Sequence, residues 1–515
     1  MKISWKNKEK LVFDKKVILY VLFALTPFVA GVLIGLISKT SIFSLDAWNT
    51  IWSDERGYYR AILIMRTQGL PTGVQSYNEV ASVYPAWGAY NIVTYLPYVL
   101  LSFITGIASH NYIYYCNVII AILGNLIVAL MLKPSKKSML WLIGFSCTFL
   151  FYQRYVWSGM SEVASVFMLL VTMACAVKLF EERLEKKYTR EILLVSIIFL
   201  SWLFGIIRPF LFAVLLVPVV YILLSDYNKG KKVVSLLCIV VGTVLALLAY
   251  VELRKGCAVY FSDATTMDTL GRYISLLKSG EIKEFVVSVL YSNYKALQAI
   301  IGQAFNMVGF VTFFYALTTL LLLYMLWRAE SLKERLLIGI YILIGIMIFE
   351  ATIVLYSPAQ LHRMLLGIVM VNCYLICLKG NKYLKVIQQV AVLMVLILAV
   401  KNRPDFFVLP QERDIVNEVV VKETYEKIMP YDADDKWGNT IAHLPEAGNL
   451  YLGFCFPTYM NTSSCKEDYL LKNIAEDTLK SKYVYLPEGN FLNDLCAEKY
   501  ELIWNEYGYC IYSRE

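Results

Sequence analysis

Carboxylates stand at the ends of apolar runs at two distant places in the sequence. Asp54 and Glu55 lie in "WSDERGYYRAI", directly after the first apolar run, and Glu162 begins a later run in "SGMSEVAS". A carboxylate in such a position can take the proton of an attacking hydroxyl group. The alternatives are that Asp54 only caps a helix and that Glu162 is solvated at the end of its span.

Arginines occupy two further ends of apolar runs. Arg208 joins two short runs in "GIIRPF", and Arg363 follows His362 at the start of a late run in "SPAQLHRMLLG". An arginine is costly in a membrane unless it meets water or an anion, and guanidinium groups bind phosphate oxygens through paired hydrogen bonds. The alternative for Arg363 is that its side chain extends to the membrane surface without a chemical role. Together these residues predict a site for a lipid phosphate at one level of the membrane.

The stretch that holds the acidic pair predicts an amphipathic helix. Asp54, Tyr58 and Met65 recur at helical spacing, so they share one stripe, with Asp54 in the first turn. Glu55 points about 100° away on the same helix. Asp54 is therefore the first candidate for a catalytic base, with Glu55 and Asp46 in reserve.

The apolar runs predict a polytopic α-helical membrane protein. Of the 515 residues, 58% are hydrophobic and 17% are charged, whereas soluble proteins of this length carry nearer 25% charge. Runs of about 15 to 22 apolar residues recur up to residue 400, which indicates about 11–12 membrane segments. The net charge of +8 reflects lysines in short loops and is no sign of nucleic-acid binding.

Lysine-rich loops predict the topology. The basic N-terminus, 1–16, is expected in the cytoplasm, where positive loops concentrate, and the run that follows is expected to stay as an anchor. Residues 17–400 would form the membrane domain, with outer loops at 38–91 and 253–304. Whether 92–108 crosses the membrane stays open; the alternation of loops favours a re-entrant segment, or one paired with another partial crossing in 38–91. The stretch 285–303 contains polar residues and is expected at the membrane interface.

The tail, 401–515, predicts a small α+β domain on the outer face. Strands are expected at 451–454 and 483–486, and helices at 412–428 and 467–482. Outside the cytosol, cysteines tend to pair, so we expect at least one disulfide in the tail. Its cysteines are Cys455, Cys465, Cys496 and Cys510.

This arrangement resembles the GT-C superfamily of integral-membrane glycosyltransferases, nearest to its protein O-mannosyltransferase and aminoarabinose transferase branch. Enzymes of that superfamily have a long first outer loop that opens with an acidic pair and a tyrosine. Asp54, Glu55 and either Tyr58 or Tyr59 stand in that position, and Glu162 begins a span as a second acidic residue does there. The resemblance covers roughly residues 10–400.

Two arginines extend the resemblance, and one motif departs from it. Arg208 with Pro209 between two short spans, and Arg363 at the start of a late span, match basic residues of the superfamily by position. The first outer loop of the family closes with a His/Lys-Pro-Pro-Leu motif, whereas this chain has "VYPAWGAY". Only Tyr84 and Pro85 match that motif.

The resemblance implies a transferase that uses a polyprenyl-phosphate sugar at the outer face of the membrane. Arg208 and Arg363 would hold the phosphate with His362 beside them, and Asp54 would deprotonate an acceptor hydroxyl that attacks the anomeric carbon with inversion. Glu162 would orient the base, bind sugar hydroxyls or help to hold a divalent metal. Some members use such a metal and others do not, so Asp54 and Glu162 are also metal candidates. Other expected substrate contacts are Tyr58, Tyr59 and Tyr84.

Two other functions stay open. A polysaccharide polymerase or ligase would use the same donors, and the charged loop 253–304 favours it through Arg254, Asp263, Asp268 and Arg272. A flippase or transporter of lipid-linked glycans would be expected to show internal repeats and polar residues near the midplane. The expected partners are the lipid donor, membrane lipids and a glycan, lipid or protein acceptor, in what we expect to be a bacterial plasma membrane.

Overall fold

A bundle of apolar helices makes up most of the chain. The computed structural model describes residues 15–39, 41–42, 53–68, 75–79, 92–105, 112–181, 187–255, 266–355, 358–402, 418–435, 437–444 and 455–514. Within these ranges, seven helices are long and apolar enough to cross a membrane. They are α5 (Tyr112–Leu132), α8 (Glu162–Glu181), α9 (Lys187–Ile207), α11 (Lys229–Lys255), α14 (Met307–Arg328), α15 (Leu332–Leu355) and α18 (Lys382–Asn402).

Several of the predicted spans are broken or short. The first run forms α1 (Lys15–Ala24) and α2 (Thr26–Ser38), which are bent by 50° and make an eighth span if taken together. The bend lies where Pro27 occupies the first turn of α2, because proline cannot continue the hydrogen bonding of the preceding helix. Other predicted spans are divided into α6 (Lys136–Thr148) with α7 (Leu150–Val156), η3 (Pro209–Leu215) with α10 (Leu216–Leu224), and α16 (Leu361–Met364) with α17 (Leu366–Lys379).

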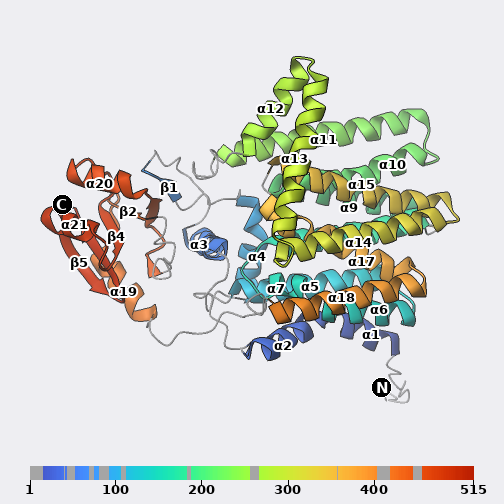
Figure 1. Cartoon of the computed structure of the whole chain (residues 1–515), viewed down its shortest axis with the longest axis horizontal. Coiled ribbons are helices and arrows are strands. Elements are labelled where there is room, and N and C mark those ends of the chain that lie inside the picture. Colours follow the sequence, from blue (N-terminus) through green and yellow to red (C-terminus); the bar gives the residue numbers. More distant parts are fainter. Residues whose placement is uncertain are drawn as a thin grey trace, which may run out of the picture.

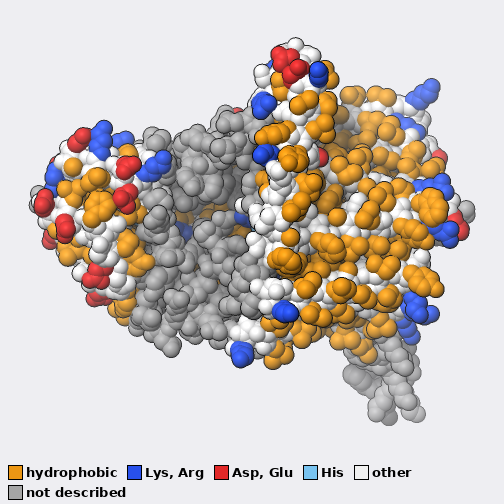
Figure 2. Space-filling view, viewed as in Figure 1, with side chains coloured by type: hydrophobic (Ala, Val, Ile, Leu, Met, Phe, Trp, Pro, Cys, Tyr) orange, Lys and Arg blue, Asp and Glu red, His pale blue; other side chains and the backbone are white. Residues whose placement is uncertain are grey.

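The outside of the bundle is apolar, as lipid contact requires. Figure 1 shows the long helices lying side by side, and Figure 2 shows a broad apolar surface over them. Leu245 of α11 and Leu320 of α14 are 60% and 63% exposed, so large apolar side chains of the long helices lie on the outside of the bundle. The chain is therefore an integral membrane protein, and the predicted fold class is confirmed.

A short helix and a helical hairpin lie at the end of the bundle that faces the tail (Figure 1). α4 (Leu96–Thr105) has 10 residues, so it is about 15 Å long, against a hydrocarbon core of about 30 Å. The described part of this segment is thus shorter than the hydrocarbon core, and whether 92–108 crosses the membrane stays a prediction. α12 (Thr266–Lys278) and α13 (Ile282–Gly302) form a hairpin that runs across the direction of the long helices (Figure 1).

The tail is built around one sheet of six strands in the order β1-β3-β2-β4-β6-β5. β3 (Asn461–Ser464), β2 (Thr440–His443) and β4 (Tyr483–Pro487) are parallel, and β6 (Tyr509–Ser513) and β5 (Glu501–Glu506) extend the sheet in antiparallel fashion. The edge strand β1 (Gln75–Tyr77) comes from the predicted first outer loop and pairs in parallel with β3. The sheet thus joins two parts of the chain almost 400 residues apart.

Helices cover both faces of this sheet. Side chains of a strand alternate between faces, so Tyr483 and Tyr485 of β4 pack with α19 (Glu418–Ile428), in a core that is continuous with that of the bundle. Val484 and Leu486 pack on the other face, with α20 (Glu467–Ala475) and α21 (Leu492–Lys499). These helices make the tail the predicted α+β unit, and the domain boundary at residue 401 stays a prediction.

The predictions for the tail have mixed outcomes. The strand expected at 483–486 is confirmed as β4, and the helix expected at 467–482 ends earlier, at Ala475. Residues 412–417 and the strand expected at 451–454 lie outside the described residues. The expected disulfide is wrong, because the four tail cysteines, all of them described and buried, form no disulfide with one another. Cys455 packs in the core shared with the bundle, apart from the other three, so these residues act as small apolar core side chains.

Candidate active site

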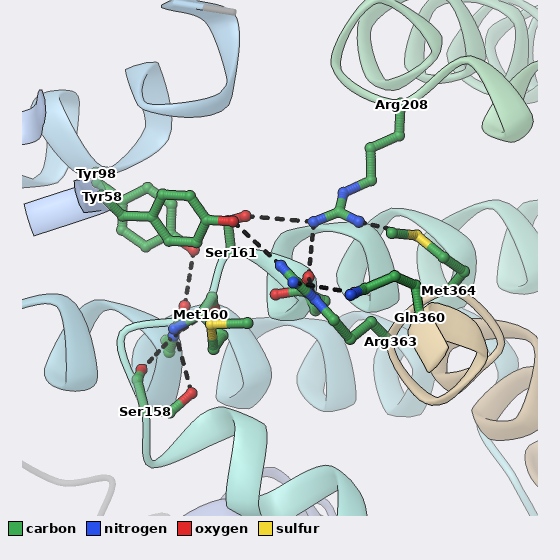
Figure 3. A network of polar contacts seen from close by, with 11 residues as sticks. Tyr58, Tyr98, Ser158, Met160, Ser161, Arg208, Gln360, Arg363 and Met364 are labelled. Carbon is green, nitrogen blue, oxygen red and sulfur yellow. Dashed lines mark hydrogen bonds and ion pairs between the residues drawn. The ribbon is translucent and has the colours of Figure 1, made fainter. Parts of the chain in front are cut away.

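Two arginines converge on one buried glutamate at the end of the bundle that faces the tail. Glu162, the first residue of α8, is 1% exposed. Its Oε1 accepts hydrogen bonds from Arg208 Nη2 at 2.8 Å and from Arg363 Nε at 2.7 Å. Figure 3 shows Arg208 and Arg363 reaching this point from two separate elements. These three predicted residues are thus brought together, and we call them the Arg–Glu centre.

The residues around the centre fix both guanidinium groups. Arg208 Nη1 donates to Met364 Sδ at 3.0 Å, and Arg363 Nη1 donates to Gln360 Oε1 at 3.1 Å. Arg363 Nη2 donates to the hydroxyl of Tyr58 at 3.2 Å. Among the described residues, Glu162 Oε2 has no hydrogen-bond partner, although a buried carboxylate oxygen normally has one.

The backbone around Arg208 explains why its side chain leaves the helix direction. Arg208 lies between the end of α9 and Pro209, the first residue of η3. Its backbone is extended, with φ −141° and ψ 104°. A residue before proline is pushed out of the helical region by the proline ring. α9 therefore stops at the level of Glu162, and Arg208 turns toward α8.

A helix from the predicted first outer loop packs against the centre. α3 (Ser53–Gln68) carries Glu55, Tyr58 and Tyr59, which are 2%, 3% and 6% exposed. Glu55 Oε2 accepts from the backbone N–H of Gly159 at 2.7 Å and from the hydroxyl of Tyr114 at 3.3 Å. Glu55 therefore ties α3 to the turn that precedes Glu162.

The same turn is held from the bundle side. Asn117 Nδ2 donates to the carbonyls of Ser158 and Met160 at 2.7 and 2.9 Å, and its Oδ1 accepts from the hydroxyl of Tyr98 at 2.8 Å. Both the nitrogen and the oxygen of the Asn117 side-chain amide thus have partners, and Figure 3 shows these partners, Tyr98, Ser158 and Met160, close together. This network sets the position at which α8 begins, and with it the position of Glu162.

The structure describes the side chains of some of the remaining predicted residues and not of others. His362 is half-buried, and its ring lies 6.3 Å from that of Tyr155. The backbone of Asp54 lies in the first turn of α3, but its side chain lies outside the described parts, as do Asp46 and Tyr84. In the loop 253–304, Arg272 is exposed on α12, and the side chains of Arg254, Asp263 and Asp268 are not described. Among the described side chains, no three His, Cys, Asp or Glu residues form a metal site.

Sequence reasoning did not single out three charged residues that make contacts here or with the tail: Arg154 and Glu79, which are buried, and Arg60, which is half-buried. Arg154 is 1% exposed and donates to the carbonyl of Trp157 at 2.9 Å. Its position inside an apolar run could have indicated a buried arginine. Arg60 and Glu79 bind the tail. Nothing in the local pattern of either residue indicates a partner about 400 positions away.

Comparisons with known proteins find relatives in structure only. No protein-family model matches the chain, and the search of curated proteins found no match. The oligosaccharyltransferase of Archaeoglobus fulgidus tethered to an acceptor peptide with the NVT sequon has a TM-score of 0.50 and 12% identity, and the match covers 92% of this chain and 69% of that chain. The archaeal oligosaccharyltransferase AglB from Archaeoglobus fulgidus, in complex with an inhibitory peptide and a dolichol-phosphate, has a TM-score of 0.50 and 11% identity, and the match covers 92% of this chain and 70% of that chain. ArnT from Cupriavidus metallidurans bound to undecaprenyl phosphate has a TM-score of 0.49 and 10% identity, covering 96% and 97%.

Proposed function

Since the chain has the membrane fold of the GT-C glycosyltransferases, we propose that it transfers a sugar from a polyprenyl-phosphate donor to an acceptor hydroxyl. The observation that carries this proposal is the convergence of Arg208 and Arg363 on Glu162. Two guanidinium groups held at one buried point form a cationic centre, and such centres suit phosphate. A structure with the same fold holds a dolichol-phosphate, which is a lipid phosphate of this class.

In this reaction the Arg–Glu centre stabilises the leaving group. The acceptor oxygen attacks the anomeric carbon from the face opposite the phosphate, and the bond between that carbon and the phosphate oxygen breaks. The lipid phosphate leaves with the electron pair, and Arg208 and Arg363 stabilise its developing charge. Because the displacement is a single step, the configuration at the anomeric carbon inverts.

The two acidic positions have different tasks in this proposal. Asp54, in the first turn of α3, takes the proton of the acceptor hydroxyl as general base. Glu162 holds the two arginines in place through Oε1, and Oε2 is able to accept a hydrogen bond from a sugar hydroxyl. Glu55 is engaged with Gly159 and Tyr114 and serves to hold α3.

The proposed site faces the outer side of the membrane, as does the tail. Figure 2 shows lysine and arginine side chains gathered at the end of the bundle away from the tail. Among the exposed basic residues are Lys136, Lys137, Lys229 and Lys382. Positive loops concentrate on the cytoplasmic side, which supports an outer position for the Arg–Glu centre.

The test is release of lipid phosphate by the purified protein in nanodiscs. The donors are polyprenyl-phosphate hexoses and pentoses labelled in the sugar, and the acceptors are a total fraction of cell-envelope lipids, glycans and proteins. Wild type should release lipid phosphate and label the acceptor fraction. Asp54→Asn should lower kcat by about 100- to 10,000-fold, and Arg363→Gln should lower kcat and weaken donor binding.

Arg272→Gln is the matched control, since Arg272 is exposed on α12, away from the Arg–Glu centre. It should keep full turnover. Full turnover in Asp54→Asn would remove Asp54 as the base, and Asp46 would take its place. Movement of the intact labelled donor across sealed vesicles, without release of lipid phosphate, would favour a flippase and overturn the transferase.

A further inference from the structure

α3 is held from two sides. On the bundle side, Tyr58 accepts from Arg363 of the Arg–Glu centre, and Glu55 accepts from the N–H of Gly159. On the other side, Arg60 Nη2 donates to the carbonyl of Met460 at 2.6 Å, and its guanidinium group also donates to the neighbouring carbonyls of Phe456 and Pro457 at 3.3 and 3.4 Å. One helix thus touches both the proposed active site and the tail (Figure 1).

The chain that follows α3 is built into the tail. β1 pairs with β3 from Gln75 opposite Thr462 to Tyr77 opposite Ser464. Directly after β1, Asn78 donates from its N–H to the carbonyl of Ser464 at 3.0 Å. Its Oδ1 accepts from the N–H of Lys466 at 2.8 Å. The segment after α3 is therefore hydrogen-bonded to β3 and to the residues that follow β3, so it is an integral part of the tail sheet.

Glu79 completes this junction. Asn78 and Glu79 have φ of 46° and 48°, a left-handed conformation that reverses the chain. Glu79 is fully buried, and its carboxylate accepts from the N–H groups of Ser481 at 2.6 Å and Lys480 at 2.9 Å and from the hydroxyl of Tyr469 at 3.1 Å. A buried carboxylate is costly unless it is fully hydrogen-bonded, and the tail supplies all three of these donors.

We propose that the tail positions α3 against the Arg–Glu centre, and that Arg60 is the positioning residue that transmits this hold. The inference rests on the proposed function, because it concerns how Asp54 and Tyr58 are set relative to Arg363. A helix of 16 residues is marginal without tertiary contacts. Misplacement of a catalytic group by about 1 Å can cost 100-fold in rate.

The chemistry of Arg60 suits a clamp. Burial lowers the pKa of Arg60 to about 10, which keeps the side chain charged at neutral pH. Its planar guanidinium group spreads several donors over three carbonyls, whereas the compact ammonium group of a lysine lacks this fork of donors. Arg60→Lys should therefore keep the charge and still lose most of the hold on the tail.

The experiment compares Arg60→Ala, Arg60→Lys and Glu79→Gln with Arg66→Ala, in the full chain in nanodiscs. Arg66 is the matched control because it lies on α3, is exposed, and stacks on Phe103 of α4 instead of contacting the tail. Two properties are measured. Steady-state kinetics give kcat and KM for the lipid donor, and hydrogen exchange with mass spectrometry follows peptides of α3 and the peptide that contains Gly159.

Arg60→Ala should lower kcat by about 10- to 100-fold, with little change in KM for the donor, because the arginines that would bind the donor are untouched. Exchange in α3 and at Gly159 should speed up about tenfold or more, since Glu55 loses its fixed position. Glu79→Gln should act in the same direction, Arg60→Lys should restore little, and Arg66→Ala should match wild type.

The two properties separate the failure of this inference from that of the proposed function. If wild type releases no lipid phosphate but Arg60→Ala speeds exchange at Gly159, the coupling stands and the transferase does not. If exchange at α3 and Gly159 is unchanged in Arg60→Ala, the coupling is wrong, whatever the activity. Faster exchange with an unchanged kcat would also overturn the positioning role.

Discussion

Glu162 shows why a single buried carboxylate can organise a site. It meets Arg208 and Arg363 where both arginine side chains are almost fully buried, at 1% and 8% exposure. Buried ion pairs contribute little to net stability compared with apolar side chains, because each charge must lose its water. Their retention inside a membrane protein therefore indicates a function. Removal of the carboxylate alone would leave two buried guanidinium groups facing each other.

Glu162→Gln should destabilise the protein strongly. The expected loss is about 3–5 kcal/mol, because the variant removes the negative charge and leaves both arginines buried. Thermal unfolding in nanodiscs measures this loss. Glu191→Gln is the matched control, since Glu191 pairs with Lys231 at 2.8 Å near the surface, where such pairs contribute about 1 kcal/mol or less. Equal changes in the two variants would contradict the structural role of Glu162.

Gly159 permits the close approach of Glu55 to the turn before α8. A Cβ atom at Gly159 would lie 3.0 Å from Cβ and 3.2 Å from Oε2 of Glu55. Gly159→Ala should therefore push Glu55 from its hydrogen bond and destabilise the protein by about 1–3 kcal/mol. Gly271→Ala on α12 meets no atom within 4 Å and should leave the unfolding temperature unchanged or slightly raised. A neutral Gly159→Ala would mean that the turn accommodates the methyl group.

At the scale of elements, the α12–α13 hairpin has the character of an interfacial structure. α13 exposes an apolar stripe that includes Val287, Leu290 and Tyr294, at 57%, 64% and 55% exposure. Asn293 Nδ2 donates to Glu350 Oε2 at 3.1 Å, which holds α13 against the end of α15. The helix runs across the long helices (Figure 1), and its apolar side chains adjoin the apolar surface of the bundle (Figure 2). These features are typical of a helix that lies in the plane of the membrane surface, which is the position expected for 285–303.

This position predicts different environments for two faces of α13. A nitroxide on Leu290→Cys should be accessible to oxygen and protected from a water-soluble relaxation agent. Lys295 lies roughly 140° around the helix from Leu290, so a nitroxide on Lys295→Cys should show the reverse pattern. Electron paramagnetic resonance of the labelled protein in vesicles measures both. Equal water accessibility at the two positions would place α13 away from the membrane.

At the scale of the whole molecule, the sequence predicts the membrane part better than its connection to the tail. Apolar runs locate most helices because lipid demands continuous hydrophobicity, and the ends of those runs place Glu162, Arg208 and Arg363 at one level. The insertion of β1 into the tail sheet could not be predicted. Three residues carry too little pattern to indicate a strand, and the contacts of Arg60 and Glu79 depend on pairing over about 400 positions. The prediction of a disulfide failed because composition does not reveal that the four tail cysteines are buried in hydrophobic cores.

The stability of the tail should depend on pH through His443. His443 is 4% exposed on β2, and its Nδ1 lies 2.8 Å from the carbonyl of Leu444. Burial lowers its pKa to about 4, from an ordinary value of 6.5. The unfolded chain therefore binds a proton more readily than the folded one, so this stability is fully present above pH 6.5 and is lost as pH falls toward 4. The loss reaches about 3 kcal/mol, and it should also loosen the hold of the tail on α3.

This loss can be measured with a thiol reagent that works in acid, from the urea concentration at which the buried thiols of Cys465 and Cys496 become reactive. That urea concentration should be lower at pH 4.5 than at pH 7 in wild type. His443→Asn keeps a donor near the carbonyl of Leu444 without a titrating ring, so its fall should be much smaller, because only the carboxyl groups of the tail still titrate. An equal fall in both proteins would show that protonation of His443 does not open the tail. Loss of α3 protection at the same pH as thiol exposure, in wild type alone, would link the acid response of the tail to the proposed active site.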